Sequence, residues 1–299
     1  MRLIAKTPAP RAMLAAKQGA RMKTILTPVE SHSFMPSVFA SAALLARRFG
    51  GYIEGAALGP DIPDLAATDF PIGGAMLDEG ARREMFEHAL AAFEAAMQAH
   101  GVARRRVDAA APSFGWAGAH LIDDSGIGSF GRVFDLIVVG RPGPNPNHPR
   151  RATLESALFD SGRPILVAPP RPPAAIGETI VIAWNASTET ARSVAFASPL
   201  LAAAKEVIVL SVTGAMTPGP SGAELARRLR MDDVRARDIL VTPAPKVAAG
   251  QTMLDTAASL GADLLIKGGY TQSRLRQLIF GGPTSHILAH ADLPVFMAH

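Results

Sequence analysis

The sequence of 299 residues contains no cysteine, which excludes disulfides, cysteine-ligated zinc, iron–sulfur clusters and a thiol nucleophile. Aromatic residues are scarce at 6%, so there is little material for stacking single-stranded nucleic acid. No apolar run approaches the roughly 18 residues that a membrane span needs. The N-terminal segment also lacks the continuous apolar stretch of a secretory signal. We therefore expect a cytoplasmic protein that binds neither nucleic acid nor membrane.

Acidic side chains are absent from residues 1–21, which carry five basic ones. The whole chain has a net charge of +4, a value that by itself suggests an acidic partner such as nucleic acid. Without this segment, 25 basic and 26 acidic residues remain, so the net charge falls to −1. We interpret residues 1–21 as a disordered basic tail, and the charge as a property of that tail.

Apolar residues make up 48% of the chain, enough for a full core, and the length favours two domains. Short β-branched runs alternate with helical apolar spacing, a pattern typical of open α/β sheets. The expected strands are 23–29, 52–58, 107–111, 134–139, 164–168, 179–183, 206–212, 237–241, 262–267 and 294–297. The expected helices are 37–49, 79–98, 152–160, 191–203, 222–231, 250–260 and 283–290, with at most a short one within 115–131.

The two halves of the sequence repeat each other. The run 134–140 (FDLIVVG) is echoed by 262–268 (ADLLIKG), and a proline-rich segment lies near mid-chain. We predict one domain at 22–170, a linker at 171–177 and a second domain at 178–299. Each domain is expected to have a doubly wound, Rossmann-like α/β architecture with an open parallel sheet, and the two are expected to pack as a pseudo-dimer.

A glycine-containing segment follows the strand expected at 262–267 and leads into the last expected helix. Small residues there let backbone N–H groups approach phosphate oxygens, and a helix N-terminus favours negative charge. Gly281, Gly282 and Thr284 are placed to form such a cradle. An ordinary turn between strand and helix also uses glycine, so both interpretations stay open.

The repeat, the strand ends and this segment together resemble the universal stress protein family in its tandem two-domain form. Nucleotide-binding members of that family share a pattern of Gly, two residues, Gly, nine residues, and Gly followed by Ser or Thr. Gly268 and Gly281 match the first and third positions. Thr271 replaces the second Gly, and Gly282 stands where the Ser or Thr belongs. Thr284 falls on a further small hydroxyl position that lies near the phosphates in that family.

The end of the first strand of each copy is a second family position, where binding members carry an Asp. Asn185 occupies it in the second copy and Glu30 in the first. Asn keeps the hydrogen bonding without the charge that helps hold Mg²⁺, and it also suits a turn or a helix cap. In the first copy Gly140 and Gly143 open the pattern, but Thr153 replaces its later Gly, and intervening prolines lack N–H groups. The first copy is therefore interpreted as a degenerate site.

The resemblance implies an adenine-nucleotide-binding regulatory or stress-resistance protein that forms a homo-oligomer. The residues that it implies for ATP, with Mg²⁺ accompanying the nucleotide, are Asn185, Gly268, Thr271, Gly281, Gly282 and Thr284. We expect no enzyme, because no nucleophile or acid–base pair is visible, although slow ATP hydrolysis occurs in some relatives. The alternative is a scaffold or regulator that binds no nucleotide and acts through protein interfaces.

Two further polar pairs stand out in the sequence. His286 and His290 share a helix face, as metal ligands do, but no third ligand is evident, which favours a surface pair. Asp123 and Asp124 lie in a glycine-rich stretch and are interpreted as a solvated turn. We therefore expect neither a metal site nor catalytic residues.

Overall fold

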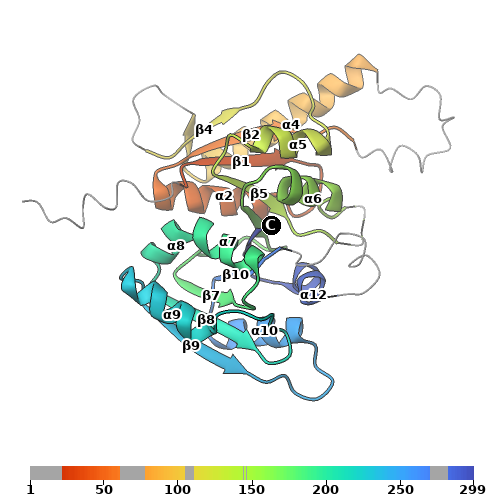
Figure 1. Ribbon diagram of the computed structural model, residues 1–299. Helices are drawn as coiled ribbons and strands as arrows, with labels where there is room; N and C mark the ends of the chain where they lie inside the picture. The colour runs from red at the N-terminus through yellow and green to blue at the C-terminus, as the bar shows by residue number, and fades with distance from the viewer. Residues whose placement is uncertain (1–21, 61–77, 105–110, 144, 146, 270–281) are drawn as a thin grey trace, which may run out of the picture.

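The computed structural model describes residues 22–60, 78–104, 111–143, 145, 147–269 and 282–299, which form one sheet with helices on both faces (Figure 1). In the first half the elements are β1 (Thr24–Val29), α2 (Met35–Phe49), β2 (Tyr52–Ala57), α4 (Glu79–Ala99), β3 (Ala103–Arg104), β4 (Ser113–Trp116), α5 (Asp124–Gly131), β5 (Leu136–Gly140), α6 (Arg151–Asp160) and β6 (Ile165–Ala168). In the second half they are β7 (Thr179–Ala183), α7 (Thr188–Phe196), α8 (Ser198–Ala203), β8 (Glu206–Val212), α9 (Gly222–Met231), β9 (Ala236–Val241), α10 (Ala249–Ser259), β10 (Leu264–Gly268), α12 (Pro283–His290) and β11 (Val295–Ala298).

The sheet has eleven strands in the order β3-β4-β2-β1-β5-β6-β11-β10-β7-β8-β9. All neighbours within each half are parallel, whereas β6 and β11 pair antiparallel, with Val167 opposite Val295. These are the last strands of the two repeats, so each copy contributes the same element to the joint. The predicted α/β class, the parallel sheets and the pseudo-dimer are confirmed, and the joint between the copies is a shared sheet.

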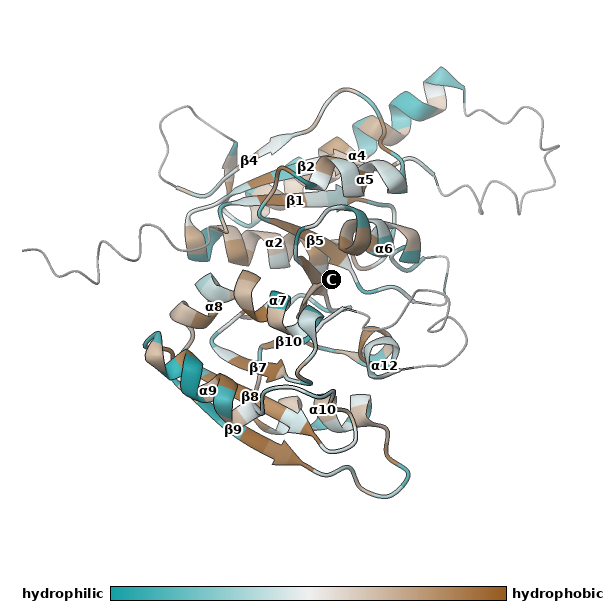
Figure 2. Ribbon diagram, in the orientation of Figure 1, coloured by the Kyte–Doolittle hydropathy of each residue, from teal (hydrophilic) through white to brown (hydrophobic). Residues whose placement is uncertain are grey.

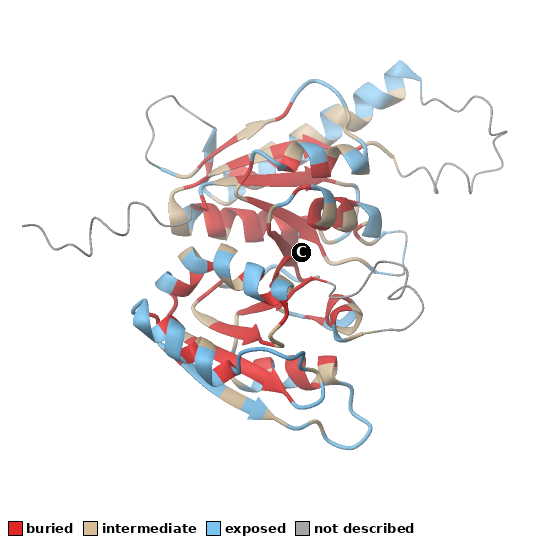
Figure 3. Ribbon diagram, in the orientation of Figure 1, coloured by how far each residue is buried: buried red, intermediate tan, exposed pale blue. Residues whose placement is uncertain are grey.

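The core follows from the composition of the strands. Parallel strands with helices on both faces are buried on both sides and are therefore continuously apolar. All five residues of β5 are buried, and the strands form the brown and red centre of Figures 2 and 3. The helices keep polar residues on their outer sides, as α9 does. Their first and last turns are marked by capping residues that can be recognised in the sequence. Ser221 and Glu224 form a capping box at the start of α9, and Gly50 ends α2 with a left-handed φ of 60°.

The sequence repeat has a structural meaning at Asp135 and Asp263. Asp135 precedes β5, and its carboxylate accepts hydrogen bonds from the backbone N–H of Thr24 and of the residue before it, at 3.0 and 2.8 Å. Asp263 precedes β10 and accepts from the N–H groups of Gly177 and Thr179 at 2.9 and 3.2 Å. Each aspartate thus fixes the chain entering the first strand of its own half.

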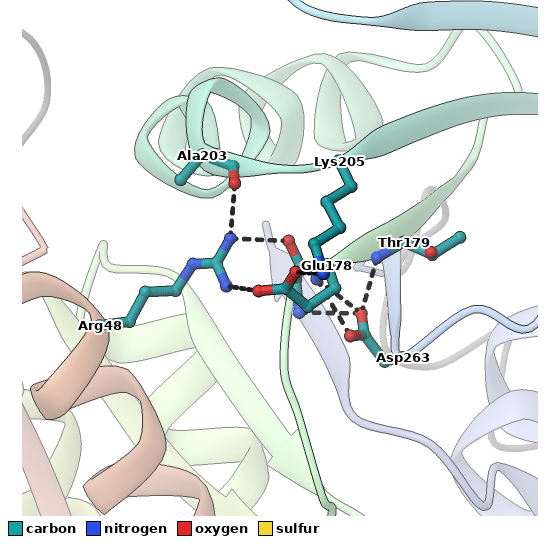
Figure 4. A network of polar contacts seen from close by, with 7 residues as sticks. Arg48, Glu178, Thr179, Ala203, Lys205 and Asp263 are labelled. Atoms are coloured by element: carbon teal, nitrogen blue, oxygen red, sulfur yellow. Dashed lines mark hydrogen bonds and ion pairs between the residues drawn. The ribbon is translucent and has the colours of Figure 1, made fainter.

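Arg48, at the end of α2, ties the first half to the second (Figure 4). Its guanidinium donates to the carbonyls of Gly177 and Ala203 at 3.0 and 2.7 Å, and to Oε1 of Glu178 at 2.7 Å. Lys205 reaches the other oxygen of Glu178 at 2.9 Å, but its side chain is 75% exposed against 19% for Arg48. Arg48 is therefore the member of this network that links the halves.

Replacing Arg48 by methionine is expected to lower the free energy of unfolding by about 1–2 kcal/mol, because two backbone carbonyls lose a charged donor. Urea denaturation measures the change. Lys205→Met is the matched control and should leave stability unchanged, since its ammonium is exposed. Equal losses in both variants would contradict the assignment of the link to Arg48.

Two expected elements differ from the structure. The helix expected over 191–203 is two helices, α7 and α8, separated at Ala197. Pro199 stands in the first turn of α8, where its missing N–H is tolerated, whereas it would break a continuous helix. The strand expected at 107–111 is wrong in its described part, because the structure places β4 at Ser113–Trp116. Residues 107–110 and the tail 1–21 lie outside the described residues.

The segment between β6 and β7 carries no helix or strand, and the predicted linker 171–177 lies within it. Within the residues that the structure describes, none of the helices combines the length and the apolarity needed to cross a bilayer.

Candidate functional site

The sequence-predicted site lies at the carboxyl ends of β7 and β10, which are neighbouring parallel strands. The chain passes from β7 to β8 on one side and returns to β10 on the other, so the strand order reverses between them. In open parallel sheets, ligands bind in the crevice outside such a switch point. Gly268 is the last residue of β10, and Asn185 follows the end of β7 by two residues.

Asn185 shapes the turn that leads from β7 into α7. Its Oδ1 accepts hydrogen bonds from the N–H of Ser187 at 3.2 Å and from the hydroxyl of Thr190 at 2.6 Å. Ser187 caps α7 by accepting from the N–H of Thr190 at 3.2 Å. The side-chain oxygen is thus used by the fold, as the turn interpretation expects, while the Nδ2 group donates to no acceptor in the described part of the chain.

Gly268 allows α7 to approach β10 closely. A Cβ atom at this position would lie 2.5 Å from the backbone nitrogen of Thr190 and 2.6 Å from its Oγ1. The structure therefore brings Gly268 and Asn185 together through Thr190. Packing between helix and strand is by itself a sufficient reason for glycine here.

Gly282 and Thr284 begin α12, Gly282 as its N-cap residue and Thr284 buried in its first turn. Because β11 is parallel to β10 and starts soon after α12 ends, α12 runs antiparallel to both strands and its N-terminus lies at their carboxyl edge. No side chain of the described residues caps this helix, and Pro283 at its first position has no N–H, so the N–H groups of Thr284 and Ser285 are the ones available to a ligand. No hydrogen bond joins this turn to Asn185 within the described residues. Thr271 and Gly281 lie outside them.

Lys267 places a buried cation at the end of β10. It is 5% exposed and lies on the sheet face of Leu265, because side chains alternate along a strand. Burial lowers the pKa of its ammonium from 10.5 to about 8, and the charge of Glu189 in α7 opposes this lowering. None of the hydrogen bonds and ion pairs among the described residues involves Nζ, although Nζ is not one of the fully buried polar atoms that lack a partner. A largely buried cation without a counter-charge among the described residues is costly, so this edge favours an anion.

At the same edge of the first half, Glu30 is buried against Arg150. The side chain of Glu30 is 5% exposed, and its Oε2 accepts from the backbone N–H of Arg150 at 3.0 Å and lies 3.5 Å from Nε. Burial raises the pKa of Glu30, and the contacts with Arg150 lower it. The guanidinium also lies 3.2 Å from the carboxylate of Asp124 and donates to the carbonyl of Gly59 at 3.0 Å. The guanidinium of Arg150 thus contacts two carboxylates and a carbonyl of the loop that follows β2.

No protein-family model matches the sequence, and no curated protein is found to be similar to it. Among solved structures, a universal stress protein from Archaeoglobus fulgidus DSM 4304 is similar with a TM-score of 0.69 at 13% identity, over 94% of this chain and 97% of that one. A structure from Pseudomonas aeruginosa UCBPP-PA14, assigned provisionally to the same proteins, has a TM-score of 0.51 at 14% identity, over 92% of each chain. The chain has the universal stress protein fold. The resemblance drawn from the sequence is confirmed at the level of the fold.

On this universal stress protein fold, two groups of charged residues were not predicted from the sequence. Lys267 had a visible signal, because a lone lysine stands in an otherwise apolar run, LLIKG. Arg150 and its contact with Asp124 had none, since 26 positions separate the two residues and the contact depends on how α5 and α6 pack. The same holds for His32, whose side chain is 1% exposed beside Glu30.

The two polar pairs have structural roles in the universal stress protein fold. Asp123 caps α5 by accepting from the N–H of Gly126 at 2.6 Å, whereas Asp124 is a partner of Arg150 and is 19% exposed. The solvated-turn interpretation is therefore wrong for Asp124. His286 and His290 stack with ring centroids 4.2 Å apart. Among the described residues no cluster of three or more His, Asp or Glu side chains is arranged to hold a metal ion.

Proposed function

We propose that this chain is a tandem universal stress protein of the cytoplasm that binds an adenine nucleotide at the carboxyl edge of its second half. Its role would be regulation or stress resistance, as a homo-oligomer. The observation that carries the proposal is Lys267, a largely buried cation with no ion pair among the described residues, at the switch point of a parallel sheet. A phosphate group in the crevice supplies the missing counter-charge, and the adenine part rests on the fold and on the family resemblance.

Three groups of the chain suit a nucleotide at this edge. The ammonium of Lys267 offers a positive charge to the phosphates, the uncapped first turn of α12 offers N–H donors, and Nδ2 of Asn185 offers a further donor. No carboxylate stands at the position of Asn185, so Mg²⁺ would be held chiefly by the phosphates. In this proposal Lys267 supplies charge and the other groups supply hydrogen-bond donors, and the proposal includes no catalysis.

The test is a calorimetric titration of the full chain with ATP and Mg²⁺. Lys267→Met is expected to weaken ATP binding at least about tenfold, because a charge-assisted contact is worth about 1.5–3 kcal/mol. Lys205→Met, which removes an exposed lysine of the same half, is the control and should bind as the unaltered protein does. No binding at millimolar ATP, or equal binding by Lys267→Met, would contradict the proposal.

The pH dependence provides a second readout of the same contact. An anion beside Lys267 raises the pKa of its ammonium above the value of about 8 that burial sets in the free protein. Binding therefore takes up a proton above pH 8, and affinity should fall about tenfold between pH 7 and pH 9. Lys267→Met should lose this slope. A flat profile for the unaltered protein would place the nucleotide away from Lys267.

The second candidate is a scaffold that binds no nucleotide. Asn185 and Gly268 favour it, because the turn before α7 and the close approach of α7 to β10 account for both residues without a ligand. This candidate predicts that ATP leaves the thermal midpoint of the protein unchanged, whereas nucleotide binding raises it with ligand concentration.

A further inference from the structure

The first half contains a cleft of about 750 Å³ between α2 and α4, at the carboxyl ends of β1 and β2. This volume lies within the range of small-molecule sites. Much of the lining is apolar, with Met35 and Phe39 from α2, Leu58 after β2 and Met85 from α4. Thioether and aromatic side chains adapt well to the faces of aromatic ligands. The walls therefore suit a flat apolar body.

A buried donor without a partner lies at the polar end of this cleft. His32 lines the cleft, its side chain is 1% exposed, and its Nδ1 accepts the N–H of Phe34 at 3.1 Å. Its proton is therefore on Nε2 in the neutral ring, and burial lowers the pKa of this histidine to about 4, so the ring is neutral near pH 7. Nε2 is buried and finds no hydrogen-bond partner, and Glu30 is 3.9 Å away. A buried unsatisfied donor favours a ligand that brings an acceptor.

The charges around the cleft oppose an anionic ligand. Glu30 and Glu84 line it, and Arg150, the cationic side chain among its described lining residues, is already engaged with Glu30, Asp124 and a carbonyl. Among the described lining residues a phosphate would thus face two carboxylates without a free guanidinium or ammonium, and with only the side chains of His88 and His148, besides the neutral His32, as further basic groups. This separates the cleft from the carboxyl end of β10, where the buried charge, on Lys267, is positive.

We propose that the cleft between α2 and α4 binds an uncharged aromatic molecule whose carbonyl or ring nitrogen accepts the hydrogen bond of His32 Nε2. The aromatic body lies against Met35, Phe39, Leu58 and Met85. This site lies in the first half, at the degenerate counterpart of the nucleotide site proposed for the second half, and does not depend on that site.

The experiment uses the full chain and two fluorescent probes of similar size. Prodan is an uncharged naphthalene ketone, and anilinonaphthalene sulfonate is an anion. Prodan is expected to bind with a blue-shifted emission, and the sulfonate at least about tenfold more weakly. His32→Phe keeps the ring shape, removes the donor and should weaken Prodan binding about fivefold. Glu84→Lys changes an exposed lining residue and should improve sulfonate binding relative to Prodan.

A third variant tests the place of binding. Ala81 lines the cleft on α4, and Ala81→Trp should fill it and abolish the emission shift of Prodan. Lys267→Met should bind Prodan unchanged, which separates this result from that of the ATP titration. The proposal is overturned if Prodan does not bind at 100 µM, which is about the weakest affinity expected for a site of this kind, or if the sulfonate binds equally well. Unchanged binding by His32→Phe or by Ala81→Trp would also overturn it.

Discussion

Replacing Lys267 by methionine is expected to raise the thermal midpoint of the protein by about 5 °C at pH 7. In the unfolded chain this ammonium has a pKa of 10.5, and in the folded protein burial lowers the pKa to about 8. The difference corresponds to about 3 kcal/mol of destabilisation below pH 8, where the folded protein must keep a charged amine buried. Methionine has a similar length and no charge, so the penalty disappears. For a chain of this size about 3 kcal/mol shifts the midpoint by about 5 °C.

The sign of the pH dependence identifies the cause. Between pH 8 and 10.5 the unfolded state holds more protons on this lysine than the folded state, so the stability of the unaltered protein rises with pH. The advantage of Lys267→Met should therefore be largest below pH 8 and fade as the pH approaches 10.5. Calorimetric scans of both proteins at pH 7, 9 and 10 measure it. A variant that is less stable at pH 7, or whose advantage is independent of pH, would contradict the buried charge.

Together with the ATP titration, this result separates function from stability. Residues that lower stability but support binding are expected at ligand sites, because the ligand supplies the counter-charge that the folded protein lacks there. Lys267→Met should thus be more stable and bind ATP more weakly. If it were more stable and bound ATP equally well, Lys267 would be a structural liability without a role in nucleotide binding.

Replacing Arg150 by methionine is expected to cost about 3–5 kcal/mol at pH 7, because it leaves the buried carboxylate of Glu30 without its cation. Asp124, 3.2 Å from the same guanidinium, loses its partner as well. The substitution removes the positive charge that lowers the pKa of Glu30, while the hydrogen bonds from the backbone N–H of residue 150 and from Thr153 remain, so this carboxyl binds a proton at a higher pH in the folded variant. The deficit against the unaltered protein should accordingly shrink as the pH falls from 7 to 5.

Denaturant titrations at pH 5, 6 and 7 measure the loss, and a double variant tests its origin. Arg150→Met with Glu30→Gln removes the unpaired charge while keeping the shape, and it should recover part of the lost stability. A deficit that is the same at every pH, or a double variant that is as unstable as Arg150→Met, would place the effect in packing. Glu30→Gln alone should cost less than Arg150→Met, since Asp124 still neutralises the guanidinium.

The sequence contained enough to predict the fold, because its signals are local and occur twice. The buried strands are visible in the sequence as apolar runs. An aspartate stands before β5 and again before β10, and each accepts hydrogen bonds from the backbone at the entry to the neighbouring strand of its half. The order of strands and the repeat together leave few arrangements open. The break at Pro199 was a local signal too, and it was missed because the helical spacing continues across it.

The site residues could be predicted only where they follow a motif. Asn185 and Gly268 were found in this way, and the hydrogen bond of Asn185 with Thr190 is local to the turn before α7, but the approach of Thr190 to Gly268 depends on how closely α7 packs on β10, which no spacing encodes. The cluster of Glu30, Arg150 and Asp124 joins three separate elements. Its burial, and hence the raised pKa of Glu30, exists only in the folded chain.

The antiparallel joint between β6 and β11 has a consequence for access. Because these two strands run in opposite directions, so do the parallel sets that each adjoins, and the carboxyl ends of the two sets lie on opposite rims of one sheet. The cleft beside His32 and the carboxyl end of β10 with Lys267 therefore lie at opposite rims of the sheet. A compound held at one rim neither touches nor displaces a compound held at the other. The two proposed ligands are therefore expected to bind independently of each other.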